Sequence, residues 1–507
     1  MYDVEKRGDK PIYEYLYMCI RDDIVSGRIK GGDKLLSKRR LAQQEGVALI
    51  TVENAYAQLL VEGYIESRER SGYYAVMDAG RFAGVSGTKN TFGIKKVNSS
   101  ANTFMSKNVA KTINNFGASN RSTKGIRGNN TVTHGMDNAH PIIADFVSQR
   151  LHDDAFPFDI WSKLMRKVLS DRNPECLAPP DPCGLEVLRY AIAGYLMRSR
   201  GIEADPDNII VGPGTEYLEN ILLVLSGGGA LTAVEDPGYK KIGLVCERAG
   251  HKCLHIPVNK DGLDVFSLEG TSVRLVNISP SHQFPTGAVM SAVRRAQLLD
   301  WAEREDAYIA EDDYDSEFRF AGRPIPPISA SSPERVIYMN TFTRTLAPSI
   351  RIAFMVLPDK LMERYRQKLS FYSGTVSSFD QLVLAEFING GYYERHLSRM
   401  RNYYSKRRDN ILKIFEDKGE EILFTPVKDN AGLRLVLKGP DWLDDDKFMS
   451  RITEKGIKLS CMNDYCYSHK REYEHLFLLS FGEADEEVFR KALDVMDEVA
   501  TVCRTKA

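Results

Sequence analysis

Several short segments in the second half of the 507-residue chain carry side chains that could hold a small phosphate-bearing molecule. Gly212-Pro213-Gly214-Thr215 follows a predicted strand and opens a predicted helix, where free backbone N–H groups and a hydroxyl suit an anion. Tyr239 follows a tight turn, and Gln283 lies in a polar loop after another strand. The acidic segment 311–315 ends a third strand, and it contains Asp312 and Tyr314. Because no His or Cys lies at ligand spacing here, a metal is the lesser interpretation.

A second group of candidate residues lies near the N-terminus and is predicted to contact DNA. Apolar residues recur at helical spacing from Ile12 to Ile24, and a second helix is predicted from Lys38 to Gln44 with Ser37 as its N-cap. A third helix is predicted from about Leu49 to Glu62, followed by two strands around residues 68–72. Three helices and a hairpin predict a winged helix-turn-helix, whose third helix has the size of the DNA major groove.

The segments that must position these residues differ in composition. Residues 1–78 are predicted to form the winged helix, an α+β unit, and residues 141–507 an α/β domain in which β-branched runs alternate with helical patterns. Between them, residues 79–140 are predicted to be a long disordered linker. Residues 81–140 include 30 Gly, Ser, Thr or Asn, and nine Lys or Arg against one Asp, so they cannot bury enough apolar surface to fold.

Composition limits the class of protein. The net charge is −1, so a nucleic-acid site must be local, and no apolar run is long enough for a membrane-spanning helix. The N-terminal residues are polar and charged, which predicts that there is no signal peptide. The eight cysteines are scattered without a CxxC pair, which is typical of reduced thiols in the cytoplasm. We therefore expect a cytoplasmic protein without membrane contact.

The N-terminal residues resemble the GntR-type winged-helix family. The resemblance rests on residues 35–42, Gly46-Val47, Thr51-Val52, Ala55-Tyr56 and Glu62-Gly63-Tyr64. The resemblance implies double-stranded DNA as the partner. Helix–turn–helix spacing alone would also fit a small protein-interaction domain, so the DNA-binding prediction depends on these family-specific segments. The expected DNA contacts are a set of polar and basic residues with one glycine: Ser37, Lys38, Arg39, Arg40, Thr51, Arg68, Arg70 and Gly72.

Two positions in this unit depart from the family pattern. The family usually reads Val-Ser-Arg-x-Thr-Val before the third helix, whereas this chain has Ala48 and Leu49 in place of the serine and arginine. The change removes a phosphate donor and a side chain that can bind a base through two hydrogen bonds. The unit has 12 Lys or Arg against 13 Asp or Glu, so the affinity must come from a local basic patch or from elsewhere.

The C-terminal segments, taken in order, resemble fold-type I, aspartate-aminotransferase-like proteins that use pyridoxal phosphate. With the winged helix ahead of them, the chain resembles the MocR-type regulators of the GntR superfamily. The resemblance implies a large mixed-sheet domain with a small α+β subdomain, and a homodimer. It also implies a cofactor site: Asp312 at the ring nitrogen, Tyr314 at the ring 3-oxygen with Gln283 or His282 nearby, Tyr239 on the ring face, and Gly214, Thr215, Thr343 and Arg351 at the phosphate.

The decisive departure from that family is Arg344. The family reads Gly-Thr-Phe-Ser-Lys-Thr-Leu, with a lysine that forms the aldimine with the cofactor, and here the segment is Asn340-Thr341-Phe342-Thr343-Arg344-Thr345-Leu346. A guanidinium stays protonated and is no amine nucleophile, so an internal aldimine cannot form there. Two further departures are Arg434, where the family has histidine, and Leu478, close to where aminotransferases place a carboxylate-binding arginine.

Two interpretations of Arg344 stay open at this point: unselected change in a domain that only dimerises, or a pocket changed to recognise an anion. We expect a transcription regulator without catalytic residues or a metal, whose aminotransferase-like domain dimerises and senses a small-molecule effector. That effector would be pyridoxal phosphate, held non-covalently only, or another anionic or amino-acid-like compound. The alternatives are an active aminotransferase with an accessory DNA-binding domain, and a DNA-binding scaffold without a ligand.

Overall fold

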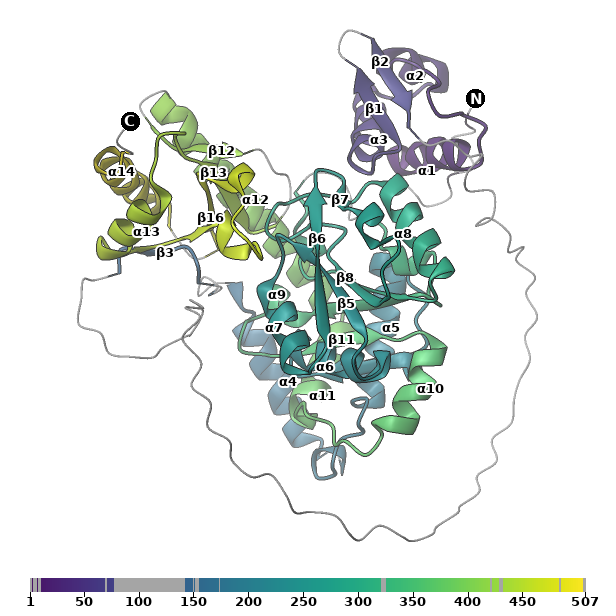
Figure 1. Ribbon diagram of the computed structural model, residues 1–507. Helices are drawn as coiled ribbons and strands as arrows, with labels where there is room; N and C mark the ends of the chain where they lie inside the picture. Colours follow the sequence, from purple (N-terminus) through teal and green to yellow (C-terminus); the bar gives the residue numbers. More distant parts are fainter. Residues whose placement is uncertain are drawn as a thin grey trace. The chain divides into compact units, whose positions relative to one another are not determined.

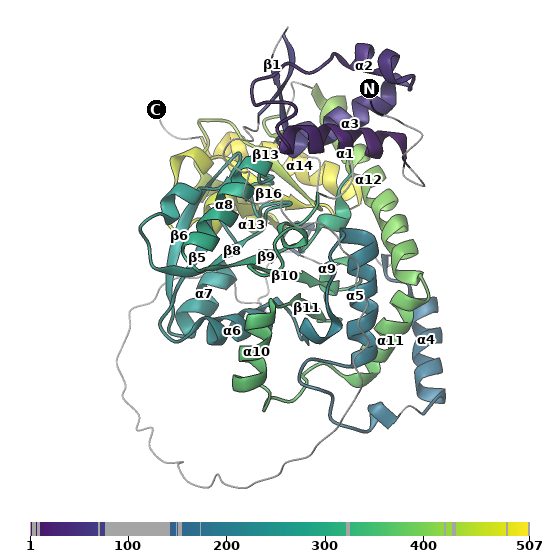
Figure 2. The same ribbon diagram turned by 90° about the vertical axis from the view of Figure 1, so that its right-hand side faces the viewer.

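The computed structural model describes residues 2, 7, 11–68, 71–76, 142–148, 150, 155–172, 174–320, 325–419, 422–427, 432–482 and 485–504. The predicted linker, residues 79–140, lies wholly outside these residues, and Arg70 lies outside them as well. The described residues form a winged helix and a larger α/β part, and each is described by itself (Figures 1 and 2).

The winged helix consists of α1 (Ile12–Val25), α2 (Lys38–Glu45), α3 (Leu49–Val61) and the antiparallel hairpin of β1 (Ile65–Arg68) and β2 (Gly72–Ala75). The hydroxyl of Ser37 accepts a hydrogen bond from the Arg40 N–H, which confirms the predicted N-cap of α2. Gly46 ends α2 in the left-handed region, at φ +64°, which a glycine adopts at little cost. Leu16, Val52 and Leu59 are fully buried in the core that joins the three helices.

The larger part is built on an eight-stranded mixed sheet with the order β4-β11-β10-β9-β8-β5-β6-β7. Its strands are β4 (Ile209–Gly212), β5 (Leu231–Asp236), β6 (Lys252–Asn259), β7 (Gly262–Leu263), β8 (Val273–Ile278), β9 (Tyr308–Asp312), β10 (Val336–Thr341) and β11 (Ala353–Val356). Its helices are α4 (Phe158–Ser170), α5 (Glu186–Arg200), α6 (Thr215–Ser226), α7 (Lys240–Arg248), α8 (Ala292–Arg304), α9 (Phe342–Thr345), α10 (Asp359–Lys368), α11 (Ser378–Asn389) and α12 (Tyr392–Lys418).

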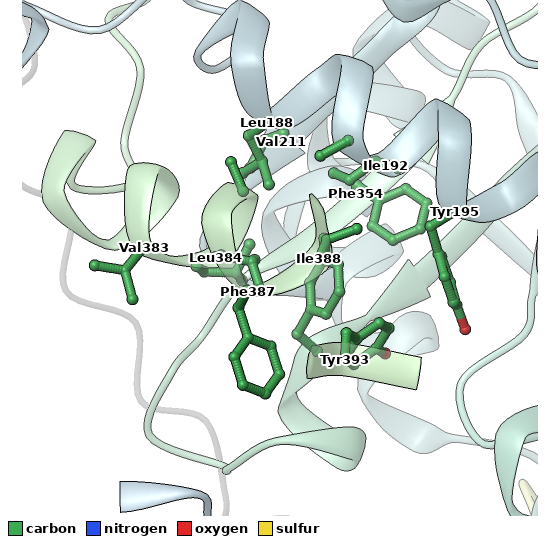
Figure 3. Close-up of a cluster of buried hydrophobic side chains, with 14 of the residues drawn as sticks. Leu188, Ile192, Tyr195, Val211, Phe354, Val383, Leu384, Phe387, Ile388 and Tyr393 are labelled. Atoms are coloured by element: carbon green, nitrogen blue, oxygen red, sulfur yellow. The ribbon is translucent and has the colours of Figure 1, made fainter. Parts of the chain in front are cut away.

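Both faces of this sheet are covered by helices, which is why its central strands β8, β9 and β10 are buried over almost their whole length. Side chains alternate along a strand, so Val211 packs with α4, α5 and α11, whereas Ile210 packs with α6 and α10. Figure 3 shows the first of these clusters, in which Leu188 and Ile192 of α5 and Phe387 of α11 surround Val211 and Phe354. The sheet is therefore a rigid central layer, and its strand ends are fixed in space.

A smaller α+β subdomain follows the long helix α12. Its four-stranded antiparallel sheet has the order β12-β13-β16-β15, and β14 pairs separately with β3. Its elements are β3 (Ala144–Asp145), β12 (Thr425–Val427), β13 (Arg434–Lys438), α13 (Asp445–Glu454), β14 (Ile457–Lys458), β15 (Ser460–Cys461), β16 (Leu476–Ser480) and α14 (Glu486–Val502). Phe448, Phe477 and Phe489 are fully buried between this sheet and its helices. The predicted combination of a large mixed sheet and a small α+β subdomain is confirmed.

Candidate functional site

The predicted DNA-contacting residues lie in three adjoining segments of the winged helix. Arg39 and Arg40 are exposed on the first turn of α2, and the capping role of Ser37 fixes where that turn begins. Lys38 lies over the ring of Tyr73, with its Nζ 5.4 Å from the ring centroid. Thr51 is half-buried on the first turn of α3, at the other side of the α2–α3 turn.

The hairpin carries the remaining members of that group. Arg68 is exposed, forms an ion pair with Glu66 at 2.6 Å and lies over the Tyr74 ring at 4.2 Å. Gly72 has φ +114°, and a Cβ atom there would lie 3.3 Å from Cε of Lys34. The strained backbone and the neighbouring lysine explain the glycine without requiring DNA, so Gly72 shapes the wing in either case.

The second candidate site lies where parallel strands of the large sheet end. β4, β5, β8, β9 and β10 run in the same direction, so the segments after them meet at one edge. Register pairs Asp312 of β9 with Met339 of β10, only five residues before Arg344. In open α/β sheets, ligands bind outside the carboxyl ends of the strands. The sequence-predicted residues after β4, β5, β9 and β10 therefore come to one edge, although they are far apart in the chain.

The Asp312 carboxyl group is built into this edge without a protein partner for one of its oxygens. Its Oδ1 is buried and has no hydrogen-bond partner among the described residues. Burial raises the pKa of Asp312 to about 7, with Asp313 and Asp315 adding to the rise and Arg344 opposing it. A buried carboxyl group that lacks a partner is costly, and it suits a ligand that donates a hydrogen bond there.

Tyr314, His282 and Asp315 form a chain of polar contacts beside Asp312. Nδ1 of His282 lies 2.9 Å from the Asp315 carboxylate and 3.4 Å from the Tyr314 hydroxyl. Burial raises the pKa of Tyr314 well above its ordinary value, so the phenol stays protonated and can donate. Gly432 packs directly against His282 and Asp315, and no side chain would fit at that position.

Arg344 is held in place by the backbone on both sides of it. Phe342 and Leu346 are buried in the core beneath α9, and the Thr341 hydroxyl accepts from the Thr343 N–H. Nε2 of His396 lies 2.7 Å from the carbonyl oxygen of Thr345. Since burial lowers the pKa of His396, the ring is neutral and donates through Nε2–H. The residue that replaces the expected lysine is thus fixed at the pocket.

A second arginine, Arg434 of β13 in the small subdomain, lies close enough to Arg344 for the two charges to interact, and the predicted set of site residues omits it. Burial and the charge of Arg434 lower the pKa of Arg344 to about 10, so Arg344 remains a cation at neutral pH. Arg344 lies over the Tyr314 ring at 5.9 Å, and Arg434 lies over the Phe284 ring at 4.5 Å. Neither guanidinium has an ion-pair partner within the described ranges.

The expected phosphate-binding residues lie together, but one of them is already paired. Gly214 has φ +120° and packs directly against the Arg351 guanidinium, and the buried Thr343 hydroxyl has no hydrogen-bond partner in the described part. Nη2 of Arg351 lies 2.9 Å from the Glu216 carboxylate, which also lies 3.4 Å from Nζ of Lys241. Although burial opposes it, a backbone hydrogen bond and Arg351 lower the pKa of Glu216. An incoming phosphate would therefore compete with this carboxylate.

Two other predicted site residues differ in their surroundings. Tyr239 precedes α7, lies edge-on to Phe284 at 6.1 Å and lines a small cavity with Thr215 and Asp312. Gln283 is 1% exposed, and its carboxamide is used by protein partners: Nε2 donates to the Phe284 carbonyl in its own loop and to the Pro237 carbonyl after β5, and Oε1 accepts from Thr286. The structure thus places His282, rather than Gln283, beside Tyr314.

These contacts decide which parts of pyridoxal phosphate the pocket suits. The unpartnered Asp312 oxygen, the Tyr314 phenol and Tyr239 fit a pyridine ring with a hydroxyl group. The guanidinium of Arg344 cannot form a covalent bond with the aldehyde of the cofactor. Arg351, the main cation expected at the phosphate, already forms an ion pair with Glu216. The residues fit the ring of the cofactor, and residue 344 is an arginine.

The described residues also bear on two other possibilities, a membrane-spanning helix and a metal site. Among them, no helix has the length and apolarity needed to cross a membrane. No group of three or more His, Cys, Asp or Glu side chains in the same ranges could hold a metal ion. His469 instead contacts Glu474, and His475 contacts Asp445.

Comparison with known proteins agrees with both halves of the structure. A model of the gntR family of bacterial regulatory proteins matches residues 12–74. An archaeal alanine:glyoxylate aminotransferase structure superposes with a TM-score of 0.63 over 72% of this chain and 91% of that chain, at 22% identity, which shows the fold alone. The chain is 33% identical to an uncharacterized HTH-type transcriptional regulator, YdeL, of Bacillus subtilis (strain 168), over 89% of each chain.

A further relative places the chain within a named group. The chain is 32% identical to the probable rhizopine catabolism regulatory protein MocR of Rhizobium meliloti, over 90% of this chain and 87% of that protein. Both regulators thus match the winged helix and the aminotransferase-like part together. The chain therefore belongs to the MocR-type family of DNA-binding transcription regulators, in which a GntR winged helix precedes a domain with the aminotransferase fold.

Proposed function

We propose that the aminotransferase-like domain of this regulator is a sensor that binds a small anion non-covalently and has no transaminase activity. The observation that carries the proposal is the pair Arg344 and Arg434, two partly buried cations whose charges interact and which have no ion-pair partner among the described residues. Two like charges brought together away from water cost free energy. An anion between them would offset that cost and form charge-assisted hydrogen bonds.

The position of Arg434 supports a carboxylate as that anion. Register pairs Arg434 with Ser480 and Val436 with Leu478, so Arg434 and Leu478 lie on the same face of the small sheet. Leu478 is the apolar residue near where the resemblance implies a carboxylate-binding arginine, and it is 3% exposed. Arg434 presents a guanidinium from the neighbouring strand instead. A planar guanidinium binds a carboxylate through two parallel hydrogen bonds.

The proposed ligand is therefore pyridoxal phosphate or a carboxylate compound of amino-acid type, in either case without a covalent bond to the protein. The expected contacts with the ring are those of Asp312, Tyr314 and Tyr239, and the expected contacts with the anion are those of Arg344 and Arg434. When bound, pyridoxal phosphate supplies an electron-poor ring and an aldehyde. The chain lacks the amine that would hold the aldehyde, so its residues bind and orient the ligand only.

Isothermal titration with the full chain tests this proposal, with pyridoxal phosphate, pyridoxal and glutamate as separate probes. We expect binding of at least one probe, weakened about tenfold or more in Arg344→Gln and in Arg434→Gln. Arg304→Gln is the matched control, because Arg304 is an exposed arginine paired with Glu269 and Asp300. Borohydride reduction with pyridoxal phosphate should leave no stoichiometric adduct on a pocket lysine. Such an adduct would contradict the proposal.

The same titration separates the two alternatives. The Glu216–Arg351 ion pair favours a domain that has lost phosphate binding, which is the scaffold alternative. A correctly folded protein that binds none of the probes, and whose DNA affinity none of them changes, would favour that alternative. Turnover of an amino acid and a keto acid would favour the aminotransferase.

The resemblance to fold-type I proteins supports a homodimer, with two winged helices that bind spaced half-sites. We propose that ligand binding changes how these two winged helices meet the DNA. Sedimentation equilibrium of the full chain measures the assembly, and DNA binding with and without the bound probe measures the coupling. A monomer at micromolar concentration would contradict the dimer, without affecting the ligand proposal.

A further inference from the structure

One face of α3 carries an unusual set of exposed side chains. Ile50, Asn54 and Ala57 are exposed, and their spacing of four and three residues puts them in one stripe along the helix. Ile50 is 61% exposed, although a large aliphatic side chain of this kind is normally buried. The opposite face is packed into the domain through Val52 and Leu59. The stripe therefore points away from the core.

The chemistry of this stripe is neutral. α3 contains no Lys or Arg, and its single acidic residue, Glu53, lies 3.9 Å from Nζ of Lys38. The carboxamide of Asn54 has no hydrogen-bond partner within the described part of the chain. α3 is the second helix of the helix-turn-helix, and this helix enters the major groove. The stripe thus offers a free carboxamide and an aliphatic side chain to the base edges.

We propose that α3 reads A·T base pairs in the major groove, with Asn54 on adenine and Ile50 on the C5-methyl group of thymine. A carboxamide matches N6 and N7 of adenine through two hydrogen bonds, and an aliphatic side chain packs on the thymine methyl. Guanine is read mostly by arginine or lysine, and α3 has neither. Arg39 and Arg40 contact phosphates, and they add affinity without sequence preference. The inference rests on the DNA-binding function of the winged helix.

The test begins with selection of duplexes from a random pool by the full-length chain. We expect the selected half-sites to share A·T pairs at the positions that α3 protects. Thymine is then replaced by uracil at those positions, which removes only the methyl group. Loss of one buried methyl should weaken binding about fourfold, equivalent to about 0.8 kcal/mol. Replacement of adenine by 7-deazaadenine removes the N7 acceptor and should weaken binding about tenfold.

Variants assign each effect to one side chain. Ile50→Ala should bind thymine and uracil duplexes equally, and Ile50→Val should keep part of the difference. Asn54→Ala should bind adenine and 7-deazaadenine duplexes equally. Gln43→Ala is the control, because Gln43 is exposed on α2 and outside the proposed contacts; it should keep both differences. Circular dichroism shows whether each variant is folded.

Two results would overturn the inference. The first is a selected half-site whose protected positions are G·C pairs. The second is a wild-type protein that binds thymine and uracil duplexes, and adenine and 7-deazaadenine duplexes, with equal affinity. If the chain retains no duplex at all, the DNA-binding function itself fails, and the inference fails with it. Selected duplexes that are insensitive to both base changes leave DNA binding intact and remove only the proposed reading by α3.

Discussion

The winged helix and the aminotransferase-like domain have changed in opposite directions at the residues that meet a ligand. The start of α3 has Leu49 where the resemblance implies an arginine, whereas the pocket has Arg344 where it implies a lysine and Arg434 where it implies a histidine. In both regions these residues stand beside a buried apolar framework, which includes Val52 and Leu59 in one and Phe342 and Leu346 in the other. The comparison teaches that the fold of each region rests on its buried core, whereas its proposed ligand contacts lie on a few side chains outside that core.

The largest expected effect comes from reversing the change in the pocket. Arg344→Lys should allow a covalent bond between the new lysine and pyridoxal phosphate, because Asp312, Tyr314, Tyr239 and Thr343 remain in place. We expect a visible absorption band that appears on adding the cofactor, and a borohydride-stable adduct on residue 344. Transamination should stay poor, because no arginine stands at residue 478 and Arg434 would hold a substrate carboxylate from the neighbouring strand instead.

The control for that experiment is Arg344→Gln, which removes the cation without adding an amine and should show no band. A folded Arg344→Lys protein that shows no band would mean that the pocket no longer accommodates the cofactor. That result would indicate that the domain has lost its cofactor pocket, and not that the pocket has changed its ligand.

The second prediction asks whether the two regions are stable independently. Leu59 is fully buried in the winged helix, and Leu59→Ala should lower the free energy of unfolding of that domain by about 3 kcal/mol. DNA affinity should fall with the folded fraction, while ligand binding by the aminotransferase-like domain should be unchanged. Calorimetric unfolding, read together with ligand titration, measures both. Equal losses of the two activities would show that the regions fold as one unit.

The third prediction concerns where DNA affinity comes from if α3 is neutral. Replacing Lys95, Lys96, Lys107 and Lys111 of the predicted linker with glutamine should reduce the salt dependence of DNA binding. The slope of log K against log salt concentration should fall by about 0.9 for each lysine that engages a phosphate. The preference among selected sequences should not change. An unchanged slope would mean that these lysines do not contact the DNA.

The smallest expected effect is a pH dependence of ligand binding. The pKa of Asp312 is raised to about 7, so the group gains a negative charge as the pH rises from 6 to 8. A simple carboxylate ligand should bind several-fold more weakly over that range, since the ionised Asp312 carboxylate then opposes the charge of Arg344. Asp312→Asn should abolish the dependence. A ligand with a protonated ring nitrogen should show the opposite trend, because the ionised carboxylate would bind it.

Much of this arrangement could be predicted from the sequence. The apolar spacing from Ile12 to Ile24 predicts α1, and Ser37 followed by a helical pattern predicts the start of α2, both of which the structure confirms. The resemblance to fold-type I proteins also implies that Asp312, Tyr314 and Arg344 belong to one site. The first two features are local, and the third follows from the resemblance.

Other features of the site could not be predicted, because they depend on where long side chains reach. Arg434 and Arg344 are 90 positions apart on different sheets, and no local pattern brings them together. The ion pair between Glu216 and Arg351 depends on the rotamers of both side chains. Gln283 is predicted to bind the ligand, but its carboxamide donates to backbone carbonyls of its own loop and of the segment after β5. In the same way, only burial shows that Ile50 and Asn54 share an open face.

The placement of the two pocket arginines on different sheets has a mechanical consequence. Arg344 follows β10 of the eight-stranded sheet, whereas Arg434 begins β13 of the four-stranded sheet, so their mutual repulsion acts across the seam between two bodies. This repulsion favours a larger separation of the two sheets. The close packing of Gly432 against His282 marks how near they can approach each other. An anion bound by both arginines would cancel the repulsion and connect the large sheet to the small subdomain. The occupancy of one small site would then set the stiffness of the whole domain.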